Sequence, residues 1–174
     1  MRYKRVYVNG YDYFITVVTY ERNPILVDNV ALLRESFRYA KTKFDFTIVA
    51  IVILPDHFHM ILHLDEAEEY SKIVSVIKRY FSKQCDEKYY AHIVQSESRN
   101  RQGYKPVWQK RFYEHTIRDE KEYQTRLDYI HFNAVKHGYA TMAKAWEYSS
   151  FGTFVKQGIY EEDWCNFDST LDLE

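Results

Sequence analysis

Two histidines separated by one phenylalanine, His57-Phe58-His59, lie inside an apolar run between residues 48 and 64. In an extended strand, residues i and i+2 point to the same face, so both imidazoles would face one way and Phe58 would enter the core. Two imidazoles side by side on a rigid strand are half of a divalent-metal site. The alternative is a polar pair on a solvated sheet face, because short motifs also occur by chance.

A tyrosine and an asparagine four residues apart, Tyr129 and Asn133, would share one face of a helix. The amide oxygen of Asn133 could supply the oxygen ligand that a hard cation such as Mg²⁺ or Mn²⁺ needs beside two histidines. A phenol whose pKa is lowered by a nearby cation is a competent nucleophile. The alternative is that Tyr129 is a core residue of an amphipathic helix and Asn133 a polar surface group.

A basic stretch precedes these residues and contains no acid over residues 99–111. Its cations, with aromatic rings between them, fit a nucleic-acid backbone and stacked bases. We therefore expect DNA contacts from Arg99, Arg101, Lys105, Trp108, Lys110 and Arg111, and a phosphate contact from His115. The alternative for each charge is a solvated surface. Residues 161–174, by contrast, hold six acids and no Lys or Arg.

Composition predicts the class of protein but not its substrate. The chain has 174 residues and 46% apolar residues, which favours one folded domain. Its formal charge of −1 gives no global attraction to polyanions, so a nucleic-acid partner must be recognised by local patches. Two distant cysteines, the lack of a secretory signal and the shortness of the apolar runs predict a cytoplasmic protein without a membrane partner.

The patterns of apolar residues predict the elements that must position these side chains. We expect strands near residues 11–20, 45–54, 57–64 and 108–117, and helices near 29–43, 70–83 and 120–137. Residues 85–107 show no clear period and are expected to form a loop. The order predicts an α+β fold of ferredoxin-like type, with an antiparallel sheet, two helices on one face and the other face free to bind. The last helix carries Tyr129 and Asn133, and an irregular acidic tail covers about 139–174.

Three segments of the sequence together resemble a known family. They are Leu54-Pro55-Asp56-His57-Phe58-His59, residues 108–115 (WQKRFYEH) and residues 128–138 (DYIHFNAVKHG). They resemble motifs of the single-tyrosine transposases with a histidine–hydrophobe–histidine (HUH) motif. The branch that they most resemble is the REP-associated tyrosine transposases, which are associated with repetitive extragenic palindromes. The similarity extends from about Tyr3 to Trp164.

The resemblance implies that His57 and His59 bind Mg²⁺ or Mn²⁺ with Asn133 as third ligand, and that Tyr129 is the nucleophile. It implies a metal-dependent single-strand DNA endonuclease and strand-transferase. This enzyme would act on palindromic hairpins through a 5′-phosphotyrosine intermediate, in the cytoplasm and near the nucleoid. Relatives usually have Pro after the asparagine, whereas this chain has Ala134. Since Ala favours helix, we expect the helix to continue past this point.

Two alternatives stay open from the sequence. A non-catalytic module of ferredoxin-like fold could bind an RNA or DNA hairpin, although the aromatic pattern of RNA-recognition domains is not found. The oligomeric state is also open. Related insertion-sequence transposases work as dimers that exchange the tyrosine helix, whereas the REP-associated branch is expected to act as monomers.

Overall fold

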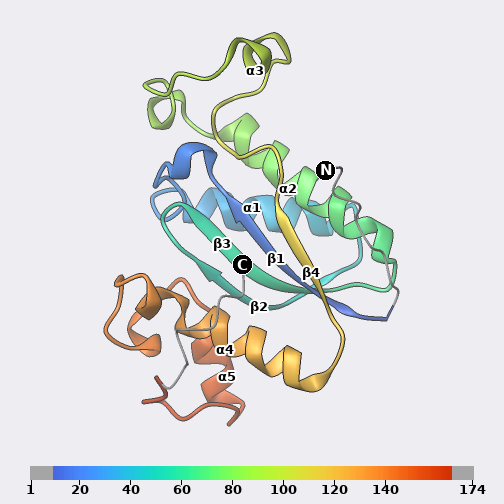
Figure 1. Cartoon of the computed structure of the whole chain (residues 1–174), viewed down its shortest axis with the longest axis vertical. Helices are drawn as coiled ribbons and strands as arrows, with labels where there is room; N and C mark the ends of the chain where they lie inside the picture. The colour runs from blue at the N-terminus through green and yellow to red at the C-terminus, as the bar shows by residue number, and fades with distance from the viewer. Residues whose placement is uncertain (1–9, 166–174) are drawn as a thin grey trace.

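The sheet at the centre of the molecule has four antiparallel strands (Figure 1). The computed structural model describes residues 10–165. The strands are β1 (Asp12–Val18), β2 (Thr47–Ile53), β3 (His57–His63) and β4 (Tyr113–Ile117). Their spatial order is β2-β3-β1-β4. This is the order that a split βαβ chain produces, and it confirms the predicted ferredoxin-like sheet.

Two helices, α1 (Val30–Lys41) and α2 (Tyr70–Gln84), pack against each other and against one face of the sheet. Phe58 points into this layer from β3. Its ring centroid lies 5.6 Å from that of Phe37 in α1 and 6.1 Å from that of Trp108. The residue between the two histidines is thus a core residue, as the alternation of a strand predicts.

The opposite face of the sheet is not free, and this part of the sequence-based expectation was wrong. The helices α4 (Glu120–Lys136) and α5 (Phe151–Lys156) lie on this side (Figure 1). Apolar residues of β1, β2 and β3, among them Phe14, Val52 and Ile61, form a second cluster with Leu127 and Ile130 of α4. The apolar side of α4 has to be buried, and this face offers the apolar surface that covers it.

The helix that carries Tyr129 has clear ends. The carboxylate of Asp119 caps its first turn by accepting a hydrogen bond of 2.8 Å from the backbone N–H of Glu122. Ala134 lies inside the helix and is buried, which confirms that the helix continues past the position where proline was expected. The helix ends at Lys136, close to the expected end at residue 137, and Gly138 then adopts a left-handed φ of +75°, a conformation that commonly ends helices.

The region between α2 and β4 is more ordered than the predicted loop, since it holds η3 (Glu87–Tyr89) and α3 (Glu97–Arg101). The strand expected from residue 108 is shorter, and Trp108 makes only an isolated bridge with Thr19. The other short helical turns are η1 (Tyr20–Arg22), η2 (Ala67–Glu69) and η4 (Ala143–Ala145). No described helix has the length and apolar character needed to cross a bilayer.

The segment that follows α4 attaches to the exposed edge of β2. The N–H of Ile53 donates to the carbonyl of Tyr148 at 2.8 Å, and the N–H of Ser150 donates to the carbonyl of Ile51 at 2.9 Å. The indole of Trp146 adds a hydrogen bond of 2.9 Å to the Ile53 carbonyl. The expected irregular tail therefore includes a segment that covers the sheet edge. Its last part, residues 166–174, lies outside the described residues, and the single-domain assignment stays a prediction.

We predict that Phe58→Ala lowers the free energy of unfolding by about 3–5 kcal/mol, because it leaves a cavity in the layer between β3 and α1. Urea denaturation measures this loss. Val94→Ala, at a position that is 87% exposed, is the control and should change stability by less than about 0.5 kcal/mol. Equal effects of the two substitutions would contradict the packing described for Phe58.

Candidate active site

His57 and His59 of β3 lie on the face of the sheet that α4 covers. Their ring centroids are 4.9 Å apart, and both side chains are buried. In the pairing with β1, His57 lies opposite Val18 and His59 opposite Thr16. The shared face that the strand alternation predicted is therefore present.

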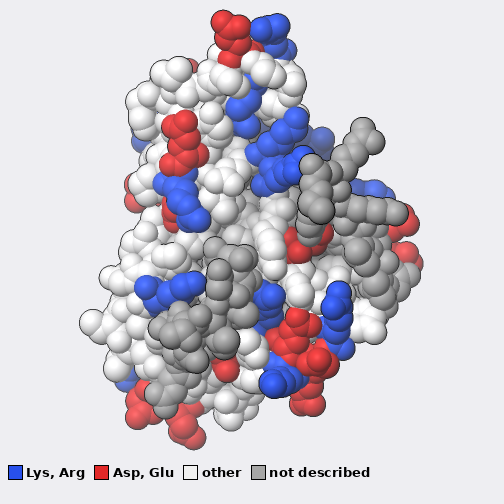
Figure 2. All heavy atoms as spheres, viewed as in Figure 1, with Lys and Arg blue, Asp and Glu red and all other residues white. Residues whose placement is uncertain are grey.

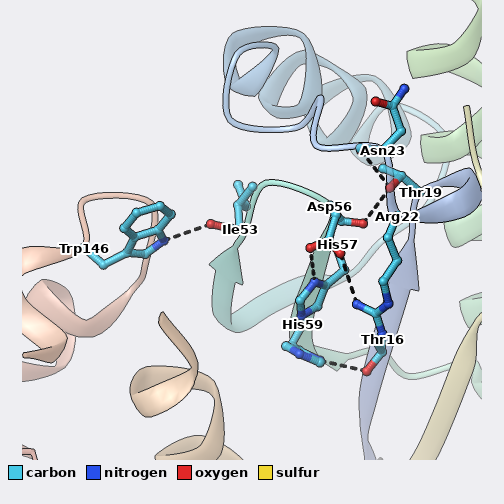
Figure 3. A network of polar contacts seen from close by, with 9 residues as sticks. All are labelled: Thr16, Thr19, Arg22, Asn23, Ile53, Asp56, His57, His59 and Trp146. Carbon is cyan, nitrogen blue, oxygen red and sulfur yellow. Dashed lines mark hydrogen bonds and ion pairs between the residues drawn. The ribbon is translucent and has the colours of Figure 1, made fainter. Parts of the chain in front are cut away.

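Each imidazole is oriented by a hydrogen bond at its Nδ1 atom (Figure 3). The Nδ1 of His57 lies 2.6 Å from Oδ1 of Asp56, and the Nδ1 of His59 lies 2.8 Å from the hydroxyl of Thr16. A carboxylate accepts, so Nδ1 of His57 carries the proton and Nε2 is the atom that could ligate a cation. Such outer partners fix the tautomer and ring orientation of metal-binding histidines.

Asp56 remains ionised in this position. Burial raises its pKa, but the hydrogen bond and charge of His57, followed by those of Arg22, outweigh burial and bring the pKa to about 2. Nη1 of Arg22 lies 3.1 Å from Oδ2 of the same carboxylate. The two oxygens of Asp56 thus join a half-exposed arginine to a buried histidine.

Tyr129 of α4 faces the histidines, and Asn133 lies one turn further along the same helix. The ring centroid of Tyr129 lies 5.3 Å from that of His59, and the tyrosine is 1% exposed. The ammonium of Lys136, two turns further along α4, donates a hydrogen bond of 3.2 Å to the phenol oxygen and lies 4.7 Å from the centre of the same ring. A positive charge therefore lies beside the atom that would act as nucleophile.

The side chain of Asn133 is fully buried, and neither its oxygen nor its nitrogen has a hydrogen-bond partner within the described residues. A buried amide without partners is costly, and it calls for an explanation such as a bound ion. The described residues contain no group of three or more His, Cys, Asp or Glu arranged to hold a metal. Two imidazole nitrogens and one amide oxygen nevertheless form a donor set that fits a divalent cation.

Four residues at this site were not found by sequence reasoning. Asp56 has no role in the sequence-based prediction, although it directly precedes the first histidine. Lys136 lies seven residues after Tyr129, a helical spacing that could have indicated it. Thr16 could not be found, because its place depends on the register of β1 with β3. The ring of His137 lies 5.2 Å from that of His57. This contact depends on where α4 ends, so it could not be found from the sequence.

Some of the predicted DNA-binding residues line one groove, and the others do not. A groove of about 750 Å³ lies between α2 and the segment that leads to β4. Figure 2 shows Lys and Arg side chains gathered over this region. Of the predicted residues, the groove is lined by Arg99, Lys105, Trp108 and Lys110, and α2 adds Lys78, Arg79 and Lys83.

The other predicted DNA contacts lie outside this groove or have other partners. Trp108 lines it but is only 4% exposed, and its indole donates to the carbonyl of Lys78 at 3.2 Å, so the ring packs in the core and is not available for a base. Arg101 pairs with Glu97 within α3. His115 pairs with Glu122 of α4. Arg111 is exposed and does not line the groove.

His131 faces away from the site and holds α4 against the C-terminal segment. Its Nε2 lies 2.9 Å from the hydroxyl of Ser150. Its ring packs against those of Phe151, Phe154 and Tyr160. Burial lowers the pKa of this histidine to about 3, so the ring is neutral in the folded protein.

The fold and the paired histidines facing a tyrosine helix define the class of the protein, and comparison with known proteins agrees. The family model described as transposase IS200-like matches residues 7–133. The chain belongs to this family of transposases, enzymes that cut and rejoin DNA strands. The sequence-based assignment to the family is thereby confirmed.

Relatives that match nearly the whole chain are named REP-associated tyrosine transposases. A Haemophilus influenzae protein whose name assigns it to the REP-associated tyrosine transposases is 39% identical over 93% of this chain and 92% of its own length. The REP-associated tyrosine transposase of Escherichia coli is 34% identical over 93% and 89%. A solved structure of a REP-associated tyrosine transposase bound to a REP hairpin has a TM-score of 0.80, 32% identity and coverage of 99% and 95%.

We predict that the burial of His131 makes stability fall in mild acid. Below the unfolded-state pKa of about 6.5, the unfolded chain binds a proton that the folded ring, with its pKa near 3, does not bind. Each pH unit below 6.5 should therefore cost about 1.4 kcal/mol until the folded pKa is approached. Urea denaturation between pH 7 and pH 5 measures this slope. His131→Gln should remove most of it, and an unchanged slope would contradict the buried neutral ring.

Proposed function

We propose that this transposase is a metal-dependent single-strand DNA endonuclease and strand-transferase in which Tyr129 is the nucleophile. The observation that carries the proposal is the contact of the Tyr129 ring with His59, beside the buried and unpartnered amide of Asn133. All of these groups belong to one chain. One chain therefore carries a complete set, which supports cleavage by a single protomer.

His57, His59 and Asn133 would hold a divalent cation, Mg²⁺ or Mn²⁺. When bound, this cation polarises the scissile phosphate as a Lewis acid and orients it for attack. The protein's own residues keep the ligands in place. Asp56 and Thr16 fix the two imidazoles, and the packing of α4 on the sheet fixes the amide.

The covalent step exchanges one phosphate ester bond for another. The Tyr129 hydroxyl releases its proton and its oxygen forms a bond to phosphorus. The bond from phosphorus to the 3′ oxygen breaks, and the 3′ oxygen takes up a proton to become a 3′-hydroxyl. The ammonium of Lys136 stabilises negative charge on the phenol oxygen before attack. The phosphotyrosine keeps the energy of the broken bond, so the 3′-hydroxyl of the same or another strand can reverse the step without ATP.

The proposed substrate is single-stranded DNA with a palindromic hairpin. A relative with 32% identity was solved with a REP hairpin bound. In this chain the groove between α2 and the segment before β4 is lined by Lys and Arg side chains, which suit the phosphates of a nucleic-acid backbone. A cytoplasmic location near the nucleoid is part of this proposal.

We predict that Tyr129→Phe abolishes the covalent protein–DNA adduct, because the variant lacks the attacking oxygen, while hairpin affinity stays nearly the same. Labelled hairpin DNA with a single-stranded extension is incubated with Mn²⁺ and separated on a denaturing gel. Tyr123→Phe, also on α4 but away from the histidines, is the matched control and should form the adduct. An adduct that persists in Tyr129→Phe, or a wild-type protein that binds the hairpin but never forms one, would favour a non-catalytic binding module.

We predict that Asp56→Asn weakens Mn²⁺ binding by about 10–100-fold, since the uncharged amide can donate as well as accept and no longer enforces the proton on Nδ1 of His57. Calorimetric titration of the DNA-free protein measures the affinity. Asp65→Asn, an exposed acid just after β3, is the control and should bind Mn²⁺ as the wild type does. Unchanged affinity in Asp56→Asn would remove the positioning role of this carboxylate.

A further inference from the structure

The turn after β1 holds its backbone in a conformation that side chains other than glycine rarely adopt. Glu21 and Arg22 have left-handed φ angles of +51° and +53°. Two such residues in succession cost free energy that the surrounding structure must supply, and strain of this kind is often found at functional sites. Neither residue has a role in the chemistry proposed above.

Hydrogen bonds tie this turn to the residues just before the metal-site histidines (Figure 3). The backbone N–H of Thr19 donates to the carbonyl of Asp56 at 2.8 Å, and the Thr19 hydroxyl lies 2.8 Å from the carbonyls of both Asp56 and Asn23. The Asn23 amide donates to the carbonyl of Tyr89 at 2.8 Å. The strained turn is thus fixed rigidly beside His57.

This arrangement fixes the position of the Arg22 guanidinium. Arg22 is 54% exposed, and within the described residues its one ion pair runs from Nη1 to Oδ2 of Asp56. An arginine has five N–H donors in a planar fork, so most of them face solvent here. The half-exposed guanidinium of Arg22 therefore contacts the same carboxylate, Asp56, that orients His57.

The same turn also borders the basic groove. The N–H of Tyr20 donates to the carbonyl of Val107 at 3.0 Å. The guanidinium of Arg99, which lines the groove, lies 4.4 Å from the centre of the Tyr20 ring. A strand that leaves the groove for the histidines on the other face of the sheet would pass this turn.

We infer that Arg22 binds a backbone phosphate of the single-stranded DNA next to the scissile position, and that the strained turn places it there. The inference rests on the proposed function for its substrate, but it concerns DNA binding and does not depend on cleavage. Arginine suits this role because its fork contacts phosphate oxygens while Asp56 fixes one nitrogen. The alternative is that Arg22 only supports Asp56.

The salt dependence of DNA binding separates these two roles. Neutralising one phosphate of a single strand contributes about 0.7 to the slope of log K against log salt. Fluorescence anisotropy over a range of KCl concentrations, with EDTA present to prevent cleavage, gives this slope for a hairpin with a single-stranded extension and for the same hairpin without it. We expect Arg22→Met to reduce the slope by about 0.7 for the extended hairpin only. Arg22→Lys should retain the slope, because it retains the charge.

Arg38→Met is the matched control, since Arg38 is an exposed arginine on α1 that does not line the groove and lies on the face of the sheet away from the histidines. It should leave both slopes unchanged. Arg22→Gln removes the charge but can still donate to Asp56, so it repeats the measurement where Met disturbs folding. A wild-type slope in Arg22→Met and Arg22→Gln, or an equal loss in Arg38→Met, would overturn the inference. Failure of the wild type to form the covalent adduct would refute the proposed chemistry and leave this measurement intact.

Discussion

The packing of α4 against the sheet is the interaction on which the site depends. The apolar side of this helix is covered by residues of β1, β2 and β3, and the same contact sets the Tyr129 ring 5.3 Å from the His59 ring. Burial of apolar surface therefore positions the groups that would carry the chemistry. The tyrosine and the histidines lie on separate elements, and without this contact the distance between them would not be fixed.

The C-terminal segment strengthens this packing from the other side. It adds hydrogen bonds along the free edge of β2, and Ser150 joins the backbone of Ile51 to the buried His131 of α4. The helix is thus held both by the sheet beneath it and by the chain that follows it. Within this chain, the tyrosine helix therefore packs against the sheet that carries the two histidines.

Polar groups at the site are organised around the two imidazoles. Asp56 and Thr16 each fix one ring, and Asp56 also contacts Arg22, which the strained turn after β1 holds in place. The basic groove lies on the side of the sheet that α2 covers, away from the histidines. The structure thus separates the basic groove from the buried histidine pair, with the turn between them.

The sequence alone determined the strand and helix order, the shared face of His57 and His59 and the end of α4 near residue 137, because these follow from local periodicity. Tertiary structure decided which groups meet. Trp108 lies in the core although its neighbours are basic, Thr16 reaches His59 through strand register, and α4 covers the face that was expected to be open. These features depend on contacts between residues far apart in the chain, and no local pattern specifies how distant apolar faces choose one another.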